Sequence, residues 1–148
     1  MRYSTEIDKE KDASLFGREL KISPKSAREV CKELVGKRSE DAEKYLEEVI
    51  GLRQPVRYTR YVGKAGHKSG YGVANYPVKA CKEILKLIKE CRANGESKGL
   101  DGERLVIKHA SAYRGRKIKG YIPRAHGKSS AHNEETTNME LIMKEIEE

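Results

Sequence analysis

The sequence has no tryptophan and a single phenylalanine, so it can bury only a small core. Hydrophobic residues make up 36% of its 148 residues, and a chain of this length is typically built around one core. No stretch approaches the roughly 18 consecutive apolar residues that a membrane-spanning helix needs. The N-terminal stretch MRYSTEIDKEKD also lacks the apolar region of a secretion signal. We therefore expect one domain over residues 1–148, located in the cytoplasm and without a membrane partner.

Cysteine is scarce, and its spacing does not suit a disulfide framework or a metal site. The three cysteines are an odd number, include no CxxC pair, and each falls within an apolar pattern of helical spacing. They are Cys31, Cys81 and Cys91. We expect them to be reduced and buried as small apolar side chains. Because the four histidines also lack the paired spacing of structural zinc sites, the sequence predicts no metal and no cofactor.

Acidic residues are absent from two long segments, although charged residues make up 36% of the chain. Residues 51–79 carry six Lys or Arg residues and residues 108–132 carry seven, with no Asp or Glu in either segment. The rest of the chain carries 18 basic and 23 acidic residues, so the net charge of +8 originates in these two segments. An ordinary solvated surface mixes both signs. Both segments are therefore predicted to bind phosphate groups of a polyanion such as a nucleic acid.

Three segments carry apolar residues at helical spacing and are predicted to form α-helices. The first begins at Ser23 and Pro24, an N-cap followed by a proline at the first helical position, and ends at Gly36. The second covers residues 39–50. The third has the longest apolar stripe, begins near residue 77, and is expected to close at the Asn-Gly pair of residues 94–95.

Alternating patterns predict β-strands at residues 13–22, 104–113 and 136–146. The last two strands should pair antiparallel, although the roughly 22 residues between them far exceed the usual hairpin loop of about two to five residues. Two extended arms of about 11 residues each would reach roughly 35 Å from the body. We predict an α+β fold in which three helices pack on a small three-stranded antiparallel sheet. A long β-hairpin (113–136) protrudes from it, together with a basic loop (51–77).

The two acid-free segments combine cations with glycine and tyrosine. Lys and Arg neutralise phosphates with release of counterions, and Arg also stacks on bases. The candidate RNA-binding residues are Arg53, Arg57, Arg60, Lys64 and Lys68 in the basic loop, and Arg114, Arg116, Lys117, Lys119, Arg124, His126 and Lys128 in the hairpin. Six tyrosines are interleaved with them, namely Tyr58, Tyr61, Tyr71, Tyr76, Tyr113 and Tyr121. Their rings can stack on unpaired bases or pack in the protein core, and the sequence leaves both interpretations open.

Four stretches together resemble one known family. They are LKISPKSAREVCKELVG from residue 20, ANGESKGLDGERLVIKHASAYRG from residue 93, YIPRAHGKSS from residue 121 and NMELIM from residue 138. The chain resembles the universal large-subunit ribosomal protein family L22, in its archaeal and eukaryotic branch, and the likeness covers residues 3–147 in order. Its sharpest element is PRAHGK, at residues 123–128.

The resemblance implies a place in the ribosome. In that family the hairpin threads into the large subunit, its tip lines the polypeptide exit tunnel, and the globular body sits on the subunit surface near the tunnel exit. By resemblance, the tip comprises Ile118, Lys119, Gly120, Tyr121, Ile122, Pro123 and Arg124, and tunnel contact extends to Lys128. The resemblance also implies ribosomal RNA contacts at the start of the first helix, by Lys21, Lys25 and Arg28. The implied partners are large-subunit ribosomal RNA, neighbouring large-subunit ribosomal proteins and the nascent polypeptide.

Two features differ from the bacterial members of the family. Glu134 and Glu135 stand where bacterial relatives place a Lys-Arg pair, so we expect the RNA-binding face to end near Lys128. Residues 51–75 resemble an insertion of the archaeal and eukaryotic branch that the short bacterial form lacks. Their assignment to RNA binding rests on charge alone.

These features favour a structural constituent of the large ribosomal subunit that binds ribosomal RNA and supports subunit assembly. The alternative is a free nucleic-acid-binding, nucleoid-like protein, which would bind duplexes broadly. A nuclease that used His126 or His132 with Glu134 would need a fixed, converging pocket, whereas these residues fall within one loop. We therefore expect no enzymatic activity.

Overall fold

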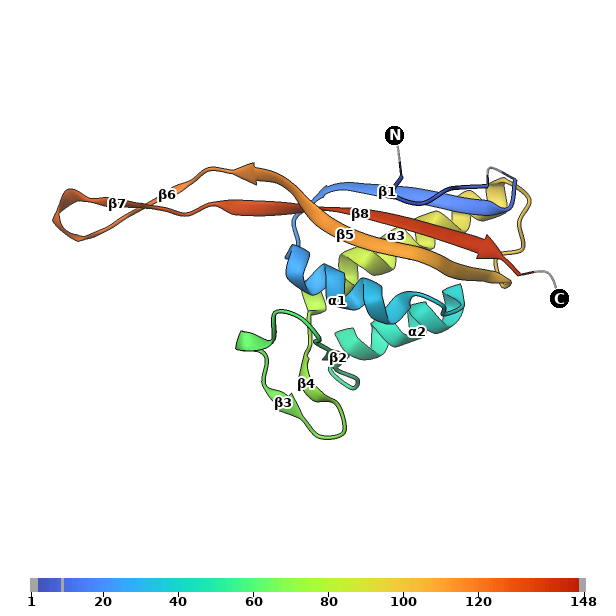
Figure 1. Ribbon diagram of the computed structural model, residues 1–148, viewed down its shortest axis with the longest axis horizontal. Coiled ribbons are helices and arrows are strands. Elements are labelled where there is room, and N and C mark those ends of the chain that lie inside the picture. Colours follow the sequence, from blue (N-terminus) through green and yellow to red (C-terminus); the bar gives the residue numbers. More distant parts are fainter. Residues whose placement is uncertain (1–2, 9, 147–148) are drawn as a thin grey trace.

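The computed structural model describes residues 3–8 and 10–146, and the remaining positions of the predicted domain lie outside the described residues. In chain order, the elements are β1 (Asp12–Leu20), α1 (Pro24–Leu34), α2 (Ser39–Ile50), β2 (Val56–Arg57), the 3-10 helix η1 (Val62–Lys64), β3 (His67–Lys68), β4 (Gly72–Asn75), α3 (Val78–Ser97), β5 (Leu105–Ile118), β6 (Tyr121–Pro123), the 3-10 helix η2 (Ala125–Gly127), β7 (Ser129–Ala131) and β8 (Glu134–Glu145). Over this part of the chain, three α-helices cover one face of an antiparallel sheet of order β1-β8-β5 (Figure 1). The predicted α+β fold is confirmed.

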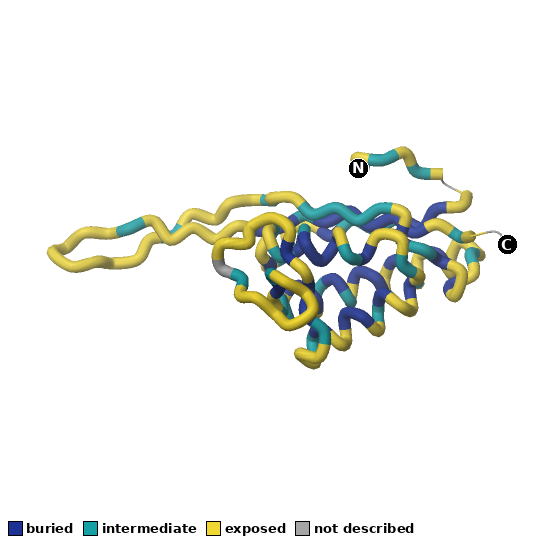
Figure 2. The backbone as a smooth tube through the Cα atoms, turned by 60° about the horizontal axis from the view of Figure 1, so that its bottom comes forward, coloured by how far each residue is buried: buried dark blue, intermediate teal, exposed yellow. Residues whose placement is uncertain are grey.

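The central strand β8 carries the core on its helix-facing side. Met139, Leu141 and Met143 alternate along it and are buried against the apolar stripes of the helices. Figure 2 shows that burial is concentrated in the sheet and helices of the body, with a few buried residues in segment 51–77. The prediction for the cysteines is confirmed, since all three are free and buried in this core. Burial raises the pKa of each thiol to about 12.

Helix α3 is longer than its pattern predicted. The expected stop at Gly95 is wrong, because the helix continues to Ser97. A Cβ on Gly95 would lie 3.0 Å from Leu105 Cδ1 and 3.2 Å from the Cβ of Ala13, so this glycine allows close packing of the helix on the sheet. The chain turns instead at Gly99, which has a left-handed φ of +85° and whose N–H donates to the Glu96 carbonyl.

Strand β1 contains an irregularity that its alternation did not reveal. Simple alternation would place Phe16 and Leu20 on the same face. The pairing with β8 shifts register between Gly17 and Leu20, and Glu19 has a φ of +52°. As a result Leu20 packs against the core, whereas the ring of Phe16 lies 6.4 Å from that of Tyr113.

The basic loop is a small folded lobe, defined here as residues 51–77. Strands β2, β4 and β3 form a sheet in that order within it, and Figure 1 shows this lobe below α1. This sheet could not be predicted from the sequence, because strands of two to four residues are too short to show a period.

The hairpin is an antiparallel ladder over most of its length, with a shift of register between Arg114 and Lys117. Strands β5 and β8 pair from Leu105 opposite Glu145 to Ile118 opposite Glu134, which extends both predicted strands well into the expected connection. Strands β6 and β7 then pair further out, and the chain reverses at η2, where His126 has a φ of +58°. Figures 1 and 2 show this arm extending away from the body with an almost wholly exposed surface.

Candidate RNA-binding surface

The cations of the hairpin all lie on its exposed arm. The predicted residues Arg114, Arg116, Lys117 and Lys119 belong to β5 or follow it directly, and Arg124, His126 and Lys128 surround the reversal; all seven are exposed. The predicted tip residues 118–124 lie on the outgoing arm, immediately before the reversal at 125–127. Tyr121 is 72% exposed there. The arm therefore presents positive charge and an aromatic ring with no core of its own.

The two arms approach closely at Gly120. The His132 N–H donates to the Gly120 carbonyl at 2.7 Å. A Cβ on Gly120 would lie 2.5 Å from the His132 carbonyl oxygen, a backbone atom that cannot move aside freely. Glycine is therefore required at this position for the outer part of the hairpin to pair as it does.

The base of the hairpin carries both basic and acidic side chains. Arg114 Nε lies 3.5 Å from Glu135 Oε2, and Lys117 stands opposite Glu135 in the ladder. Glu134 and Glu135 also line a cleft with Lys21 and Lys79, at the starts of α1 and α3. The acids therefore partly neutralise the base of the hairpin, consistent with an RNA-binding face that is strongest further out.

The start of α1 lies between the hairpin and the lobe (Figure 1). Lys25 is exposed and its Nζ lies 5.4 Å from the centroid of the Tyr61 ring. Lys21 is also exposed, in the cleft at the hairpin base. Arg28 is less available, because its Nη1 donates to Glu29 Oε1 at 2.8 Å. Of the three predicted contacts here, Lys21 and Lys25 are exposed, whereas the charge of Arg28 is paired with Glu29.

A buried carboxylate fixes the lobe to α1. Glu29 is fully buried, and its oxygens accept hydrogen bonds from the N–H and hydroxyl of Thr59, at 2.9 and 3.0 Å, and from the N–H of Arg60 at 3.2 Å. Burial alone would raise the pKa of this carboxyl, but these hydrogen bonds and the charge of Arg28 outweigh burial and lower the pKa below its ordinary value. Sequence reasoning missed Glu29, which is one of two acids on its helix.

The lobe presents exposed cations around this anchor. Arg53, Arg57, Arg60 and Lys68 are exposed, while the side chain of Lys64 lies outside the part that the structure describes. The tyrosines divide between rings packed within the protein and rings exposed to solvent. Tyr58 is buried and its hydroxyl donates to Ser26 Oγ, and Tyr113 donates to Glu140. The exposed rings are those of Tyr61, Tyr71, Tyr121 and, despite its hydrogen bond, Tyr113.

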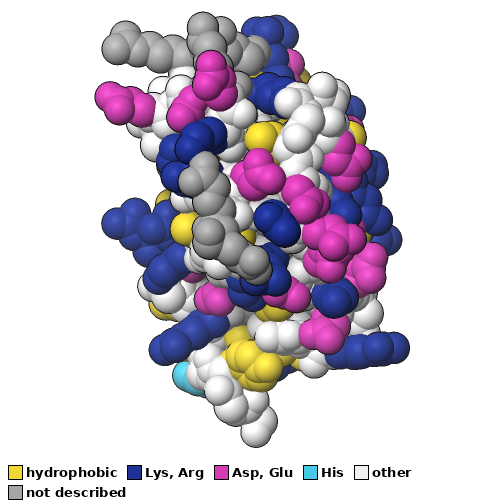
Figure 3. Space-filling model, turned by 90° about the vertical axis from the view of Figure 1, so that its right-hand side faces the viewer, with side chains coloured by type: hydrophobic (Ala, Val, Ile, Leu, Met, Phe, Trp, Pro, Cys, Tyr) yellow, Lys and Arg dark blue, Asp and Glu magenta, His cyan; other side chains and the backbone are white. Residues whose placement is uncertain are grey.

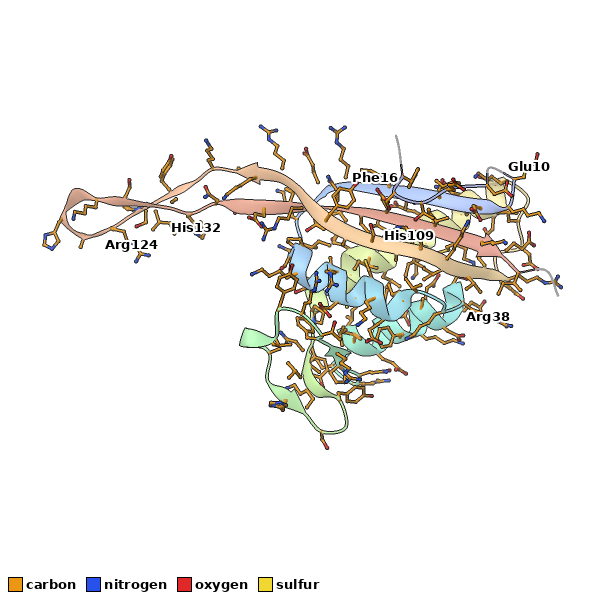
Figure 4. All side chains as sticks on the ribbon, in the orientation of Figure 1. Glu10, Phe16, Arg38, His109, Arg124 and His132 are labelled. Carbon is orange, nitrogen blue, oxygen red and sulfur yellow. The ribbon has the colours of Figure 1, made fainter. Side chains whose placement is uncertain are left out.

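Charge is distributed differently at the end of the molecule that lies opposite the hairpin. Figure 3 shows acidic and basic side chains interspersed over that end, as on an ordinary solvated surface. Figure 4 places Arg124 and His132 out on the hairpin and His109 on the body.

Among residues 3–8 and 10–146, no group of three His, Cys, Asp or Glu side chains could hold a metal. No helix in the same ranges is long and apolar enough to cross a membrane.

Comparison with known proteins agrees with the resemblance. The model of the family described as ribosomal protein L22p/L17e matches residues 15–144. The large ribosomal subunit protein uL22 of Methanococcoides burtonii is 44% identical over 147 residues, which cover 99% of this chain and 97% of that protein. The uL22 protein of Methanocaldococcus jannaschii is 43% identical over 148 residues, with 98% and 95% covered, and that of Methanopyrus kandleri is 41% identical over 144 residues, with 95% and 91% covered. The chain belongs to the L22 family of ribosomal proteins and is of the archaeal type.

Proposed function

We propose that this protein is a structural, non-enzymatic constituent of the large ribosomal subunit, and that it binds ribosomal RNA through three surfaces. These are the outer hairpin, the start of α1 and the lobe. The relatives are named as large ribosomal subunit proteins over nearly the whole length of this chain. The observation that carries the proposal is the hairpin, a paired arm outside the core whose seven candidate contact residues are all exposed. Such an arm suits insertion into a folded polyanion.

Sedimentation of the full chain tests this function. A tagged copy expressed in an archaeal host should sediment with the large subunit at low salt, because many phosphate contacts bind it there. High salt should release it progressively. A protein found spread over genomic DNA, or one that sediments away from the subunit at low salt, would support the nucleoid-like alternative instead.

We also propose that the outer hairpin contacts the nascent polypeptide. The support is its length, the exposure of Ile122 and Tyr121 near the reversal, and the family resemblance. A photo-crosslinking amino acid at position 121 should capture a stalled nascent chain in translating ribosomes. The same group at Tyr71, an exposed ring of the lobe, serves as the control and should capture none. Equal capture at both positions, or at neither, would contradict the placement of the tip.

A further inference from the structure

A second concave site lies between the start of α1 and the lobe, apart from the hairpin. The side chains that line it include Ser23, Lys25, Ser26, Tyr58, Tyr61 and Asn75. The cleft has a volume of about 460 Å³, within the range of roughly 300–1,000 Å³ that is typical of small-ligand sites. Its walls combine two aromatic rings with a cation, an amide and hydroxyl groups. We call this cleft the base pocket.

The two tyrosines of the base pocket differ in exposure. Tyr58 is 8% exposed and fixed by its hydrogen bond to Ser26, so it forms a wall. Tyr61 is 47% exposed and has a φ of +55°, a left-handed conformation that tyrosine rarely adopts. Glu29 holds the two residues before it, Thr59 and Arg60. The backbone around Tyr61 is therefore held in place while almost half of the residue stays exposed.

The polar groups of the pocket are placed to receive a nucleotide. Asn75 Oδ1 accepts the N–H of Tyr76 at 2.8 Å, which leaves the NH₂ of its amide to donate. Lys25 Nζ lies over the Tyr61 ring, 5.4 Å from its centroid, so this flexible side chain can move to the phosphate of a nucleotide whose base stacks on the ring. The Ser23 side chain makes no capping hydrogen bond to α1 and remains available.

We propose that the base pocket holds one unstacked nucleotide of RNA. The base of this nucleotide stacks on Tyr61, and an acceptor atom on the base edge accepts a hydrogen bond from the Asn75 NH₂. The phosphate of the nucleotide binds Lys25. Aromatic stacking combined with side-chain hydrogen bonds is the means by which proteins recognise bases that are splayed out of RNA helices. The inference rests on the proposed RNA-binding function, to which it adds a specific ligand, an unpaired base, at a site outside the hairpin.

Chemical probing of RNA in purified large subunits tests this inference, with Tyr61→Leu and Tyr61→Phe compared to the unmodified chain. Leucine removes the aromatic face and keeps apolar bulk, whereas phenylalanine keeps the face. We expect one nucleotide that is protected from base-modifying reagents in the unmodified and Phe forms to become several-fold more reactive with Leu. Asn75→Ala should expose the same nucleotide.

Tyr71→Leu is the matched control, because this exposed tyrosine of the same lobe is not among the lining residues. It should leave that nucleotide protected. Protein content of the subunits, measured in parallel, separates the two claims. Subunits that lack the unmodified chain would overturn the proposed function. Subunits that retain the Tyr61→Leu chain with an unchanged reactivity pattern would overturn the base pocket alone.

Discussion

The carboxylate of Glu29 links the lobe to the body through a single buried side chain. Its pKa is lowered from an ordinary value of 4.5, so the unfolded chain takes up a proton at this group more readily than the folded chain does. The stabilisation from this group is therefore complete above about pH 4.5 and is lost as the pH falls through the lower folded pKa. Acid should weaken the attachment of the lobe.

Glu29→Gln should reduce the free energy of unfolding by about 1.5–3 kcal/mol at neutral pH, the usual contribution of a hydrogen bond to a charged group. It should also make stability less dependent on pH below 4.5. Urea unfolding at pH 7 and pH 4 measures both effects. Glu47→Gln, at an exposed position of α2, is the control. Equal losses in the two variants would show that Glu29 is not the anchor.

Gly120 is the second residue whose identity the structure constrains. Gly120→Ala places a Cβ against the His132 carbonyl and should separate the arms locally. We expect amide exchange at His132 to accelerate several-fold, with little change in global stability because the pair lies outside the core. Gly66→Ala, where nothing lies within 4 Å of the added Cβ, should change neither quantity. An unchanged exchange rate in the Gly120 variant would refute the close approach.

At the scale of elements, the outgoing arm of the hairpin should dominate RNA binding. The test variant replaces Arg114, Arg116, Lys117 and Lys119 with Ala. Each phosphate contact removed lowers the slope of log affinity against log salt by about 0.7–0.9. Because Glu135 already shares one of the four charges, the slope should fall by about 2–3. Large-subunit yield should fall as well.

The control for this variant removes the same charge from the body. It replaces four exposed lysines of α2 and α3, namely Lys44, Lys82, Lys86 and Lys89. It should leave the salt dependence and the subunit yield nearly unchanged. If the two quadruple variants behave alike, net charge rather than the hairpin determines binding.

The helices were largely predictable, and the exceptions have local physical causes. Residues 39–50 match α2 in full, because a strong 3.6-residue period and clear ends coincide. Gly95 was misjudged as a stop because its role depends on Leu105 and Ala13, which are remote in sequence. Glu29 carried no signal, since a buried acid is recognisable only once its partners from the lobe are known. Charge counting located the two basic segments but not the base pocket, which also needs the start of α1.

At the scale of the whole molecule, the fold separates two kinds of surface. The body buries the apolar residues and mixes both charges at the end farthest from the hairpin (Figures 2 and 3). The hairpin and the lobe project from the body (Figure 1), and both carry exposed cations. Thin elements gain little from burial within their own chain. Binding to RNA accounts for their charge and for their extension.

A density map of the large subunit that contains this chain tests the central claim most directly. The proposed function predicts that the outer hairpin is enclosed by ribosomal RNA, with Arg116, Lys119 and Arg124 within hydrogen-bonding distance of phosphates and the reversal at residues 125–127 facing the exit tunnel. A map in which the hairpin projects into solvent, with the chain attached through its mixed-charge end, would contradict it.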